Sequence, residues 1–216
     1  VPLKVRFKDQ EYFDYQLSSE EFYRKLESED QLPVTSQPSP EDFTNLYRQL
    51  LQEYEEIISI HISSGLSGTI NAANIAKESL KGSIHIIDSK TISLGIGLMV
   101  MEAARNISEG LSALQIVERL TSVRKNIETL FTLNTLEYLQ KGGRIGRVQG
   151  IVGSLLNIKP VIRVGDDGIY HTYKKARSQE RALNNIVQAF KELANGRKYV
   201  QLAVAHGAAY QAGIYL

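Results

Sequence analysis

Hydrophobic and polar positions follow two different periods along the chain, which predicts a succession of strands and helices. At the start, Leu3, Val5 and Phe7 alternate with polar residues, as in a strand with one buried face. Later segments are short, apolar and rich in β-branched residues, which is typical of buried strands. They are EIISIHI, SIHIID and TLFTL, at residues 56–62, 83–88 and 129–133.

Between the strands, apolar residues recur every three or four positions, which predicts helices with one buried side. The first helix begins after Ser39, because a capping hydroxyl followed by Pro40, Glu41 and Asp42 is a strong start signal. Ser112 and Gln115 predict a capping box for another. The apolar positions of the four helices are Phe43, Leu46, Tyr47, Leu50, Leu51 and Tyr54; Ala72, Ile75, Ala76 and Leu80; Met99, Ala103, Ala104 and Ile107; and Ile116, Val117, Leu120 and Val123.

The alternation of helices with apolar strands predicts an α/β fold with a mostly parallel sheet covered by helices, because parallel strands need a crossover connection. Ligands of such folds bind at the carboxyl ends of the strands. The loops SSGLSGT and DSKTIS, at residues 63–69 and 88–93, both follow strands. We therefore expect both hydroxyl-rich loops at that edge of the sheet.

The pattern changes in the last third of the chain. KPVIRV and GIYHTYKKA flank GDDG, which predicts an antiparallel hairpin. A capped helix with Leu183, Ile186, Val187, Phe190 and Leu193 follows, and then a predicted strand, VQLAVAH, at residues 200–206. We place a boundary near residue 157, between an N-terminal α/β domain (1–157) and a smaller α/β domain (158–216).

Composition narrows the class of protein. The 216 residues are 43% hydrophobic with a net charge of +1, which suits a globular protein rather than a polyanion binder. The chain has no cysteine, no apolar run of membrane-spanning length and no signal-peptide pattern, so we expect a cytoplasmic protein without an integral membrane segment. Because it opens on a strand and stops in an apparent helix, we expect further segments on both sides.

Several common catalytic motifs are incomplete. A G-x-S-x-G nucleophile motif would begin at Gly65 with Ser67 as its serine, but Thr69 stands where the motif needs its last glycine. The sequence also contains no phosphate loop and no dinucleotide fingerprint. The four histidines are scattered, and His61 and His85 lie in predicted strands, where a structural role is the more common one. We expect neither a metal nor another cofactor.

The loop hydroxyls predict a site for a small anion. Ser63, Ser64, Ser67 and Thr69 precede a helix, and one hydroxyl would be enough to cap it. Helix starts favour anions, and neutral hydroxyls without a neighbouring lysine suit a carboxylate better than a phosphate. Thr35 and Ser36 of TSQPSP, residues 35–40, offer two more hydroxyls, although a turn followed by a helix cap would also explain this segment.

Five strings in order, TSQPSP, ISSGLSGT, IIDS followed by GIG, YLQKGGRIG and LLNIKP, resemble the DegV family of bacterial lipid-binding proteins. The family includes the fatty-acid-binding subunit of fatty acid kinase. The resemblance implies two α/β domains that hold one long-chain fatty acid, such as palmitate, stearate or oleate, between them. It also implies a carrier that presents the carboxylate to a separate ATP-dependent kinase subunit and is not itself an enzyme.

The same resemblance assigns residues to roles. Thr35 and Ser67 match family residues that hydrogen-bond the carboxylate, and Ser36, Ser64 and Gly68 are pocket neighbours. Arg177 matches a basic residue linked to the head group or the kinase, and Arg144 is a weaker candidate. The family's opening strand and its C-terminal histidine have no counterpart here, and His206 does not replace that histidine.

Two other functions remain open at this point. Ser67 could be the nucleophile of a hydrolase or transferase, although no general base is recognisable. Residues 139–181 hold nine Lys or Arg against three Asp or Glu, which indicates either a solvated surface or a nucleic-acid site. We expect no nucleic-acid partner.

Overall fold

Serine residues start most of the longer helices in the structure, which is a computed structural model describing residues 1–151 and 158–216. Ser39 caps α2 (Pro40–Leu50) by accepting a hydrogen bond from the Asp42 N–H, while the Asp42 carboxylate accepts one from the Ser39 N–H. Ser112 and Gln115 form the predicted capping box of α5 (Ala113–Arg124). Ser18 and Ser178 cap α1 (Ser19–Ser28) and α7 (Gln179–Ala194).

A parallel pair of strands carries the middle of the chain. β4 (Glu56–His61) and β5 (Ser83–Asp88) pair in parallel with Ile57 opposite Ile84, and α3 (Thr69–Glu78) is the crossover between them. Both strands end at the same edge, where His61 lies opposite Asp88. The loops after the two strands therefore start side by side, as predicted.

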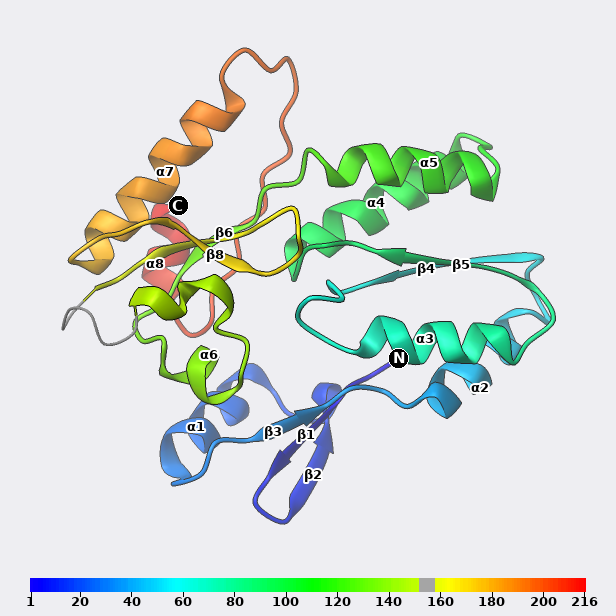
Figure 1. The fold of residues 1–216 in the computed structure, drawn as a ribbon, viewed down its shortest axis with the longest axis horizontal. Coiled ribbons are helices and arrows are strands. Elements are labelled where there is room, and N and C mark those ends of the chain that lie inside the picture. Colours follow the sequence, from blue (N-terminus) through cyan, green and yellow to red (C-terminus); the bar gives the residue numbers. More distant parts are fainter. Residues whose placement is uncertain (152–157) are drawn as a thin grey trace. The chain divides into compact units, whose positions relative to one another are not determined.

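Helices cover both faces of this pair, α2 and α3 on one face and α4 (Leu94–Ser108) and α5 on the other (Figure 1). Side chains that alternate along the strands form two separate cores, as the period of a strand requires. One core holds Phe43, Tyr47, Ile57, Ala72, Ala73, Ala76 and Ile84; the other holds Ile87, Met99, Ala103, Ile116 and Leu120.

An antiparallel sheet precedes these elements. It has the strand order β2 (Gln10–Phe13), β1 (Lys4–Phe7), β3 (Val34–Ser36). The alternation predicted at the start is present in β1, where Val5 and Phe7 are buried. Leu3 lies before β1 and is exposed. A short 3-10 helix, Asp14–Gln16, leads from β2 toward α1.

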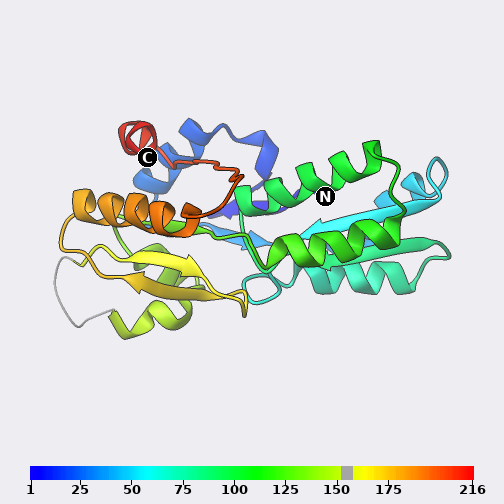
Figure 2. The same ribbon diagram turned by 90° about the horizontal axis from the view of Figure 1, so that it is seen from above.

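A second antiparallel sheet has the order β6 (Leu130–Thr132), β7 (Val161–Val164), β8 (Tyr170–Lys174). The β7–β8 hairpin is the one predicted around GDDG. α7 lies along this sheet (Figure 2), where Ala182 packs with Val161 and Ala176. The other elements are α6 (Glu137–Lys141), a 3-10 helix (Gly146–Ile151) and α8 (Tyr210–Tyr215).

Contacts divide the chain into two units. Unit 1 contains residues Val1–Ile127 with Asp166–Gly168, and unit 2 contains Glu128–Gly165 with Ile169–Leu216. The division falls between Ile127 and Glu128 because β6 pairs with β7. The boundary predicted near residue 157 lies outside the described residues. No helix of residues 1–151 and 158–216 is both long and apolar enough to cross a membrane.

The structure corrects three details of the predicted α/β fold. TLFTL was expected in the parallel layer, but β6 pairs antiparallel with β7, so the parallel sheet of the described residues is β4–β5 alone. Residues 200–206 do not form a strand, because no described strand pairs with them. Leu202 in this segment is 59% exposed. Tyr54 and Leu80 lie past the ends of α2 and α3, and Ile75 and Ile107 face outward on their helices.

Candidate functional site

The hydroxyl loop, residues 62–68, is a tight turn between β4 and α3. The N–H groups of Leu66 and Ser67 both donate to the Ser63 carbonyl oxygen, at 3.0 and 3.1 Å. The Ser63 N–H donates to the Thr91 carbonyl oxygen at 3.0 Å, which joins this loop to the one after β5. Backbone hydrogen bonds thus fix the positions from which Ser64 and Ser67 project.

The start of α3 differs from the serine-capped helices. Its N-cap is Gly68, which makes no side-chain capping bond. The hydroxyls of Ser67 and Thr69 lie 2.8 Å apart, and the Thr69 N–H donates to the Ser67 oxygen at 3.3 Å. A helix N-terminus carries a partial positive charge, so two hydroxyls at an end without a side-chain cap suit a small anion.

The TSQPS segment meets the hydroxyl loop at Gly68. Thr35 and Ser36 are exposed residues of β3, which pairs with β1, and the chain continues to Gln37. A Cβ atom added to Gly68 would collide with the Gln37 side-chain amide. The fold therefore brings together the two segments that carry the predicted carboxylate ligands, Thr35 and Ser67.

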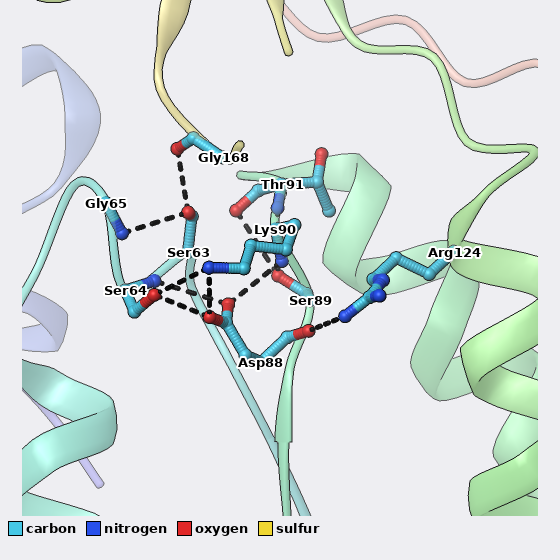
Figure 3. A network of polar contacts seen from close by, with 9 residues as sticks. All are labelled: Ser63, Ser64, Gly65, Asp88, Ser89, Lys90, Thr91, Arg124 and Gly168. Carbon is cyan, nitrogen blue, oxygen red and sulfur yellow. Dashed lines mark hydrogen bonds and ion pairs between the residues drawn. The ribbon is translucent and has the colours of Figure 1, made fainter. Parts of the chain in front are cut away.

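A charged pair that the sequence did not single out holds the other side of the loop (Figure 3). The Ser64 hydroxyl donates to Asp88 Oδ2 at 2.6 Å, and the Ser64 N–H donates to Asp88 Oδ1 at 3.2 Å. Lys90 Nζ donates to the Ser64 hydroxyl and to Asp88 Oδ2, both at 2.9 Å. We expected a carboxylate rather than a phosphate because no lysine is near this loop in the sequence. The fold places Lys90 against the loop, so this reason for preferring a carboxylate is weaker than we expected.

The acid of this pair is held in its ionised form. Burial raises the pKa of Asp88, whereas hydrogen bonds from Ser64 and Lys90 lower it, and the net shift is below the ordinary value. The Arg124 guanidinium donates to the Asp88 carbonyl oxygen at 3.2 Å. The string IIDSKT is the sequence signal that could have identified Asp88, because an acid at the carboxyl end of a parallel strand lies at the edge where ligands bind.

Buried hydroxyl groups anchor the hydroxyl loop to the interior of unit 1. Ser63 and Ser89 are fully buried and Thr91 is nearly so. The Ser63 hydroxyl donates to the Gly168 carbonyl oxygen at 2.7 Å, and the Thr91 N–H donates to the Ser89 hydroxyl oxygen at 3.2 Å. Of the loop serines, Ser63 is therefore structural, whereas Ser64 and Ser67 are more accessible.

The two histidines of the parallel strands, His61 and His85, each have a side-chain partner within the fold. His61 is buried, its Nε2 lies 2.8 Å from the Ser59 hydroxyl, and burial lowers its pKa. His85 pairs with Glu56. No cluster of three or more His, Cys, Asp or Glu occurs within residues 1–151 and 158–216. Thr69, not a histidine, is the side-chain partner of the Ser67 hydroxyl, which gives a nucleophilic Ser67 no support.

The two predicted arginines lie in unit 2. Arg177 is exposed and directly precedes Ser178, the N-cap of α7. Arg144 is exposed, and its guanidinium donates to the Gly142 carbonyl oxygen at 2.6 Å beside Gly143, which has a φ of +72°. The glycines of KGGRIG therefore form a turn that fixes Arg144 at the surface of that unit.

Known proteins are similar to this chain in sequence and in fold. A family model described as "Uncharacterised protein, DegV family" matches residues 1–214. A DegV domain-containing protein of Clostridium acetobutylicum is 42% identical over 210 residues, which are 96% of this chain and 74% of that protein.

Solved structures extend the comparison to ligands. A DegV family protein from Thermus thermophilus, described by its fatty acid binding, is 38% identical with a TM-score of 0.86, covering 92% of this chain and 71% of that one. A DegV family protein from Ruminococcus gnavus, solved with vaccenic acid, is 26% identical with a TM-score of 0.88, covering 100% and 77%. The α/β fold predicted from sequence is thereby confirmed.

Proposed function

This chain belongs to the DegV family, and we propose that it binds one long-chain fatty acid and holds the carboxylate at the start of α3. The observation that carries the proposal is the arrangement at Gly68. There a helix without a side-chain cap begins beside the Ser67 and Thr69 hydroxyls and against the TSQPS segment. The Thermus thermophilus and Ruminococcus gnavus relatives, which are described with fatty acids, support the ligand class.

The head group would be bound by neutral donors. Thr35 and Ser67 are the carboxylate ligands in this proposal, with Ser36, Ser64 and Gly68 around them. Each hydrogen bond to an ionised group contributes about 1.5–3 kcal/mol. An apolar tail supplies about 0.8 kcal/mol for each CH2 group removed from water, so the tail provides most of the gross binding energy and the hydroxyls set its orientation.

Lipid analysis and affinity measurements test this function. Native mass spectrometry of the purified protein, followed by solvent extraction, is expected to show one fatty acid per chain. Combining Thr35→Ala with Ser67→Ala is expected to weaken oleate binding at least about tenfold, since both lost donors face a charged group. Ser122→Ala, at an exposed serine of α5, is the matched control and is expected to bind oleate as the unmodified protein does.

Two results would count against the proposal. Unchanged oleate affinity in the double variant would overturn the assignment of the head group to these hydroxyls. A protein that neither retains nor takes up oleate or palmitate would overturn fatty acid binding itself.

We further propose that the protein is a carrier that delivers its fatty acid to a separate kinase. The bound carboxylate would be presented to an ATP-dependent fatty acid kinase, which forms the acyl phosphate, while this chain performs no chemistry. The pairing of Ser67 with Thr69 supports a binding role for that hydroxyl. Exposed Arg177 and Arg144 are the candidate contacts for the kinase or the head group.

Acyl phosphate formation tests the carrier role. With oleate, ATP and the catalytic subunit of a bacterial fatty acid kinase, the protein is expected to support acyl phosphate formation, and Arg177→Ala is expected to lower the rate. Arg197→Ala, an exposed arginine beyond α7, is the control for lost charge. Acyl phosphate made without the kinase subunit would show that the chain is itself an enzyme.

A further inference from the structure

Asp88 places a negative charge against a loop that, under the proposed function, binds an anion. Its carboxylate accepts hydrogen bonds from the Ser64 N–H, the Ser64 hydroxyl and the Lys90 N–H, the last at 3.0 Å. Ser67, the proposed carboxylate ligand, lies one turn further along the same loop. Because Asp88 bonds to the loop that would bind the head group, an isolated Asp88 would repel an anion there, most strongly within the screening length of about 8 Å at physiological salt.

Lys90 removes this conflict. Its ammonium lies 2.9 Å from Asp88 Oδ2 and donates to the Ser64 hydroxyl at the same distance, so it bridges the acid and the loop (Figure 3). The side chains of Lys90 and Asp88 are 31% and 19% exposed, so water screens their charges only in part.

The backbone at Lys90 indicates that its side chain matters. Its φ is +51°, in the left-handed region where glycine and asparagine are more easily accommodated than lysine. The same position held by glycine or asparagine would carry less backbone strain. Such outliers persist where surrounding contacts hold them, and they are frequent at ligand sites.

We propose that Asp88 and Lys90 are a charge-balanced pair of positioning residues, which holds Ser64 in place and makes the site selective for an ionised head group. The inference rests on the proposed fatty acid binding and adds to it the source of head-group selectivity. In this pair Asp88 fixes the loop, and Lys90 cancels the charge that Asp88 would otherwise direct at the ligand.

A pair of ligands that differ only in head-group charge tests the proposal. Oleate and oleyl alcohol have the same tail, so their affinities separate charge from packing. Each is measured by equilibrium dialysis with radiolabelled ligand on the full chain and on Lys90→Gln, Lys90→Arg and Lys77→Gln. Lys77 is an exposed lysine in the last turn of α3, so Lys77→Gln removes the same charge at the opposite end of that helix.

We expect Lys90→Gln to weaken oleate binding about tenfold, because one acid is left uncompensated near the ligand, and to change oleyl alcohol binding less than about twofold. Lys90→Arg is expected to restore oleate binding, and Lys77→Gln to change neither ligand. Adding Asp88→Asn to Lys90→Gln is expected to recover part of the lost oleate affinity, since the repelling charge is then gone.

The outcomes distinguish the pair from the underlying function. Equal losses for oleate and oleyl alcohol in Lys90→Gln would mean a purely structural role, and no loss for either would mean no role. Both results overturn the proposal while leaving fatty acid binding intact. If the unmodified protein binds neither ligand, the fatty acid function fails and the selectivity role fails with it.

Discussion

The Ser63 hydroxyl donates a 2.7 Å hydrogen bond to the Gly168 carbonyl oxygen, 105 positions further along the chain. Ser63 is fully buried, and Gly168 has a φ of +78°. Residues Asp166–Gly168 group with unit 1, so the bond is internal to that unit. This bond fixes Ser63, whose carbonyl oxygen accepts the hydrogen bonds from the Leu66 and Ser67 N–H groups that form the turn of the hydroxyl loop.

Gly168→Ala is expected to destabilise unit 1 for two reasons. A Cβ atom there would collide with the Ser63 hydroxyl and with Cδ of the Lys90 side chain, and the left-handed backbone is unfavourable for alanine. Together these effects predict a loss of about 2–4 kcal/mol in the free energy of unfolding, measured by urea denaturation.

Gly110→Ala is the matched control for the backbone term. Gly110 has a φ of +80°, but a Cβ atom there would have no atom within 4 Å. Its expected loss is about 1–2 kcal/mol, from the left-handed backbone alone. Equal losses in the two variants would mean that the collisions with Ser63 and Lys90 contribute nothing.

Gly97→Ala is expected to stabilise the protein. Gly97 lies inside α4, and an added Cβ atom would again have no atom within 4 Å. Glycine within a helix is less favourable than alanine by about 0.5–1 kcal/mol, so the urea midpoint should rise by a corresponding amount. A lower midpoint would show that α4 needs the glycine for a reason other than helix propensity.

Features set by neighbouring residues were predictable from sequence. Ser39 and Ser112 mark helix starts because a cap and its partner are three positions apart. The buried strands follow from apolar runs such as 56–62. The placement of both hydroxyl-rich loops at one edge follows from the parallel crossover between β4 and β5.

Features that depend on distant partners were not predictable. Lys90 bonds to Ser64 across 26 positions, and only the pairing of two strand ends brings them together. An apolar segment such as TLFTL does not specify which strand it joins, and residues 200–206 have strand-like composition without a described partner. Gln37 was overlooked because only the folded chain places it against Gly68.

Acid is expected to destabilise unit 1 through His61. Burial lowers the pKa of His61 below 6.5, so between the folded and unfolded values the unfolded chain binds more protons. Stability is therefore full above about pH 6.5 and falls as the pH drops toward the lowered pKa. Asp88 adds to the loss at lower pH, because its pKa is below 3.8 and its hydrogen bonds to Ser64 disappear on protonation.

Urea titrations between pH 8 and pH 5 measure the histidine effect. The free energy of unfolding is expected to decrease across this range, and His61→Gln is expected to flatten the decrease, since glutamine does not titrate. A slope as steep in His61→Gln as in the unmodified protein would assign the acid sensitivity to another group.

Gly68→Ala should separate ligand binding from stability. The backbone of Gly68, with φ −77° and ψ 3°, suits alanine, and the clash is with the end of the flexible Gln37 side chain, which is free to rotate away. We expect a change below about 1 kcal/mol in the free energy of unfolding, because no core contact is lost. Oleate affinity is expected to fall, since the methyl group and the displaced amide lie beside Ser67 at the start of α3.

A double-mutant cycle with Gln37→Ala identifies the cause of that loss. If the displaced amide obstructs the head group, Gly68→Ala should weaken oleate binding less in the Gln37→Ala background than alone, because the colliding group is absent. Equal losses in both backgrounds would assign the effect to the methyl group itself. A large loss of stability in Gly68→Ala would instead show that the contact between the TSQPS segment and α3 is part of the fold, so that the two segments proposed to bind the carboxylate are held together before any ligand arrives.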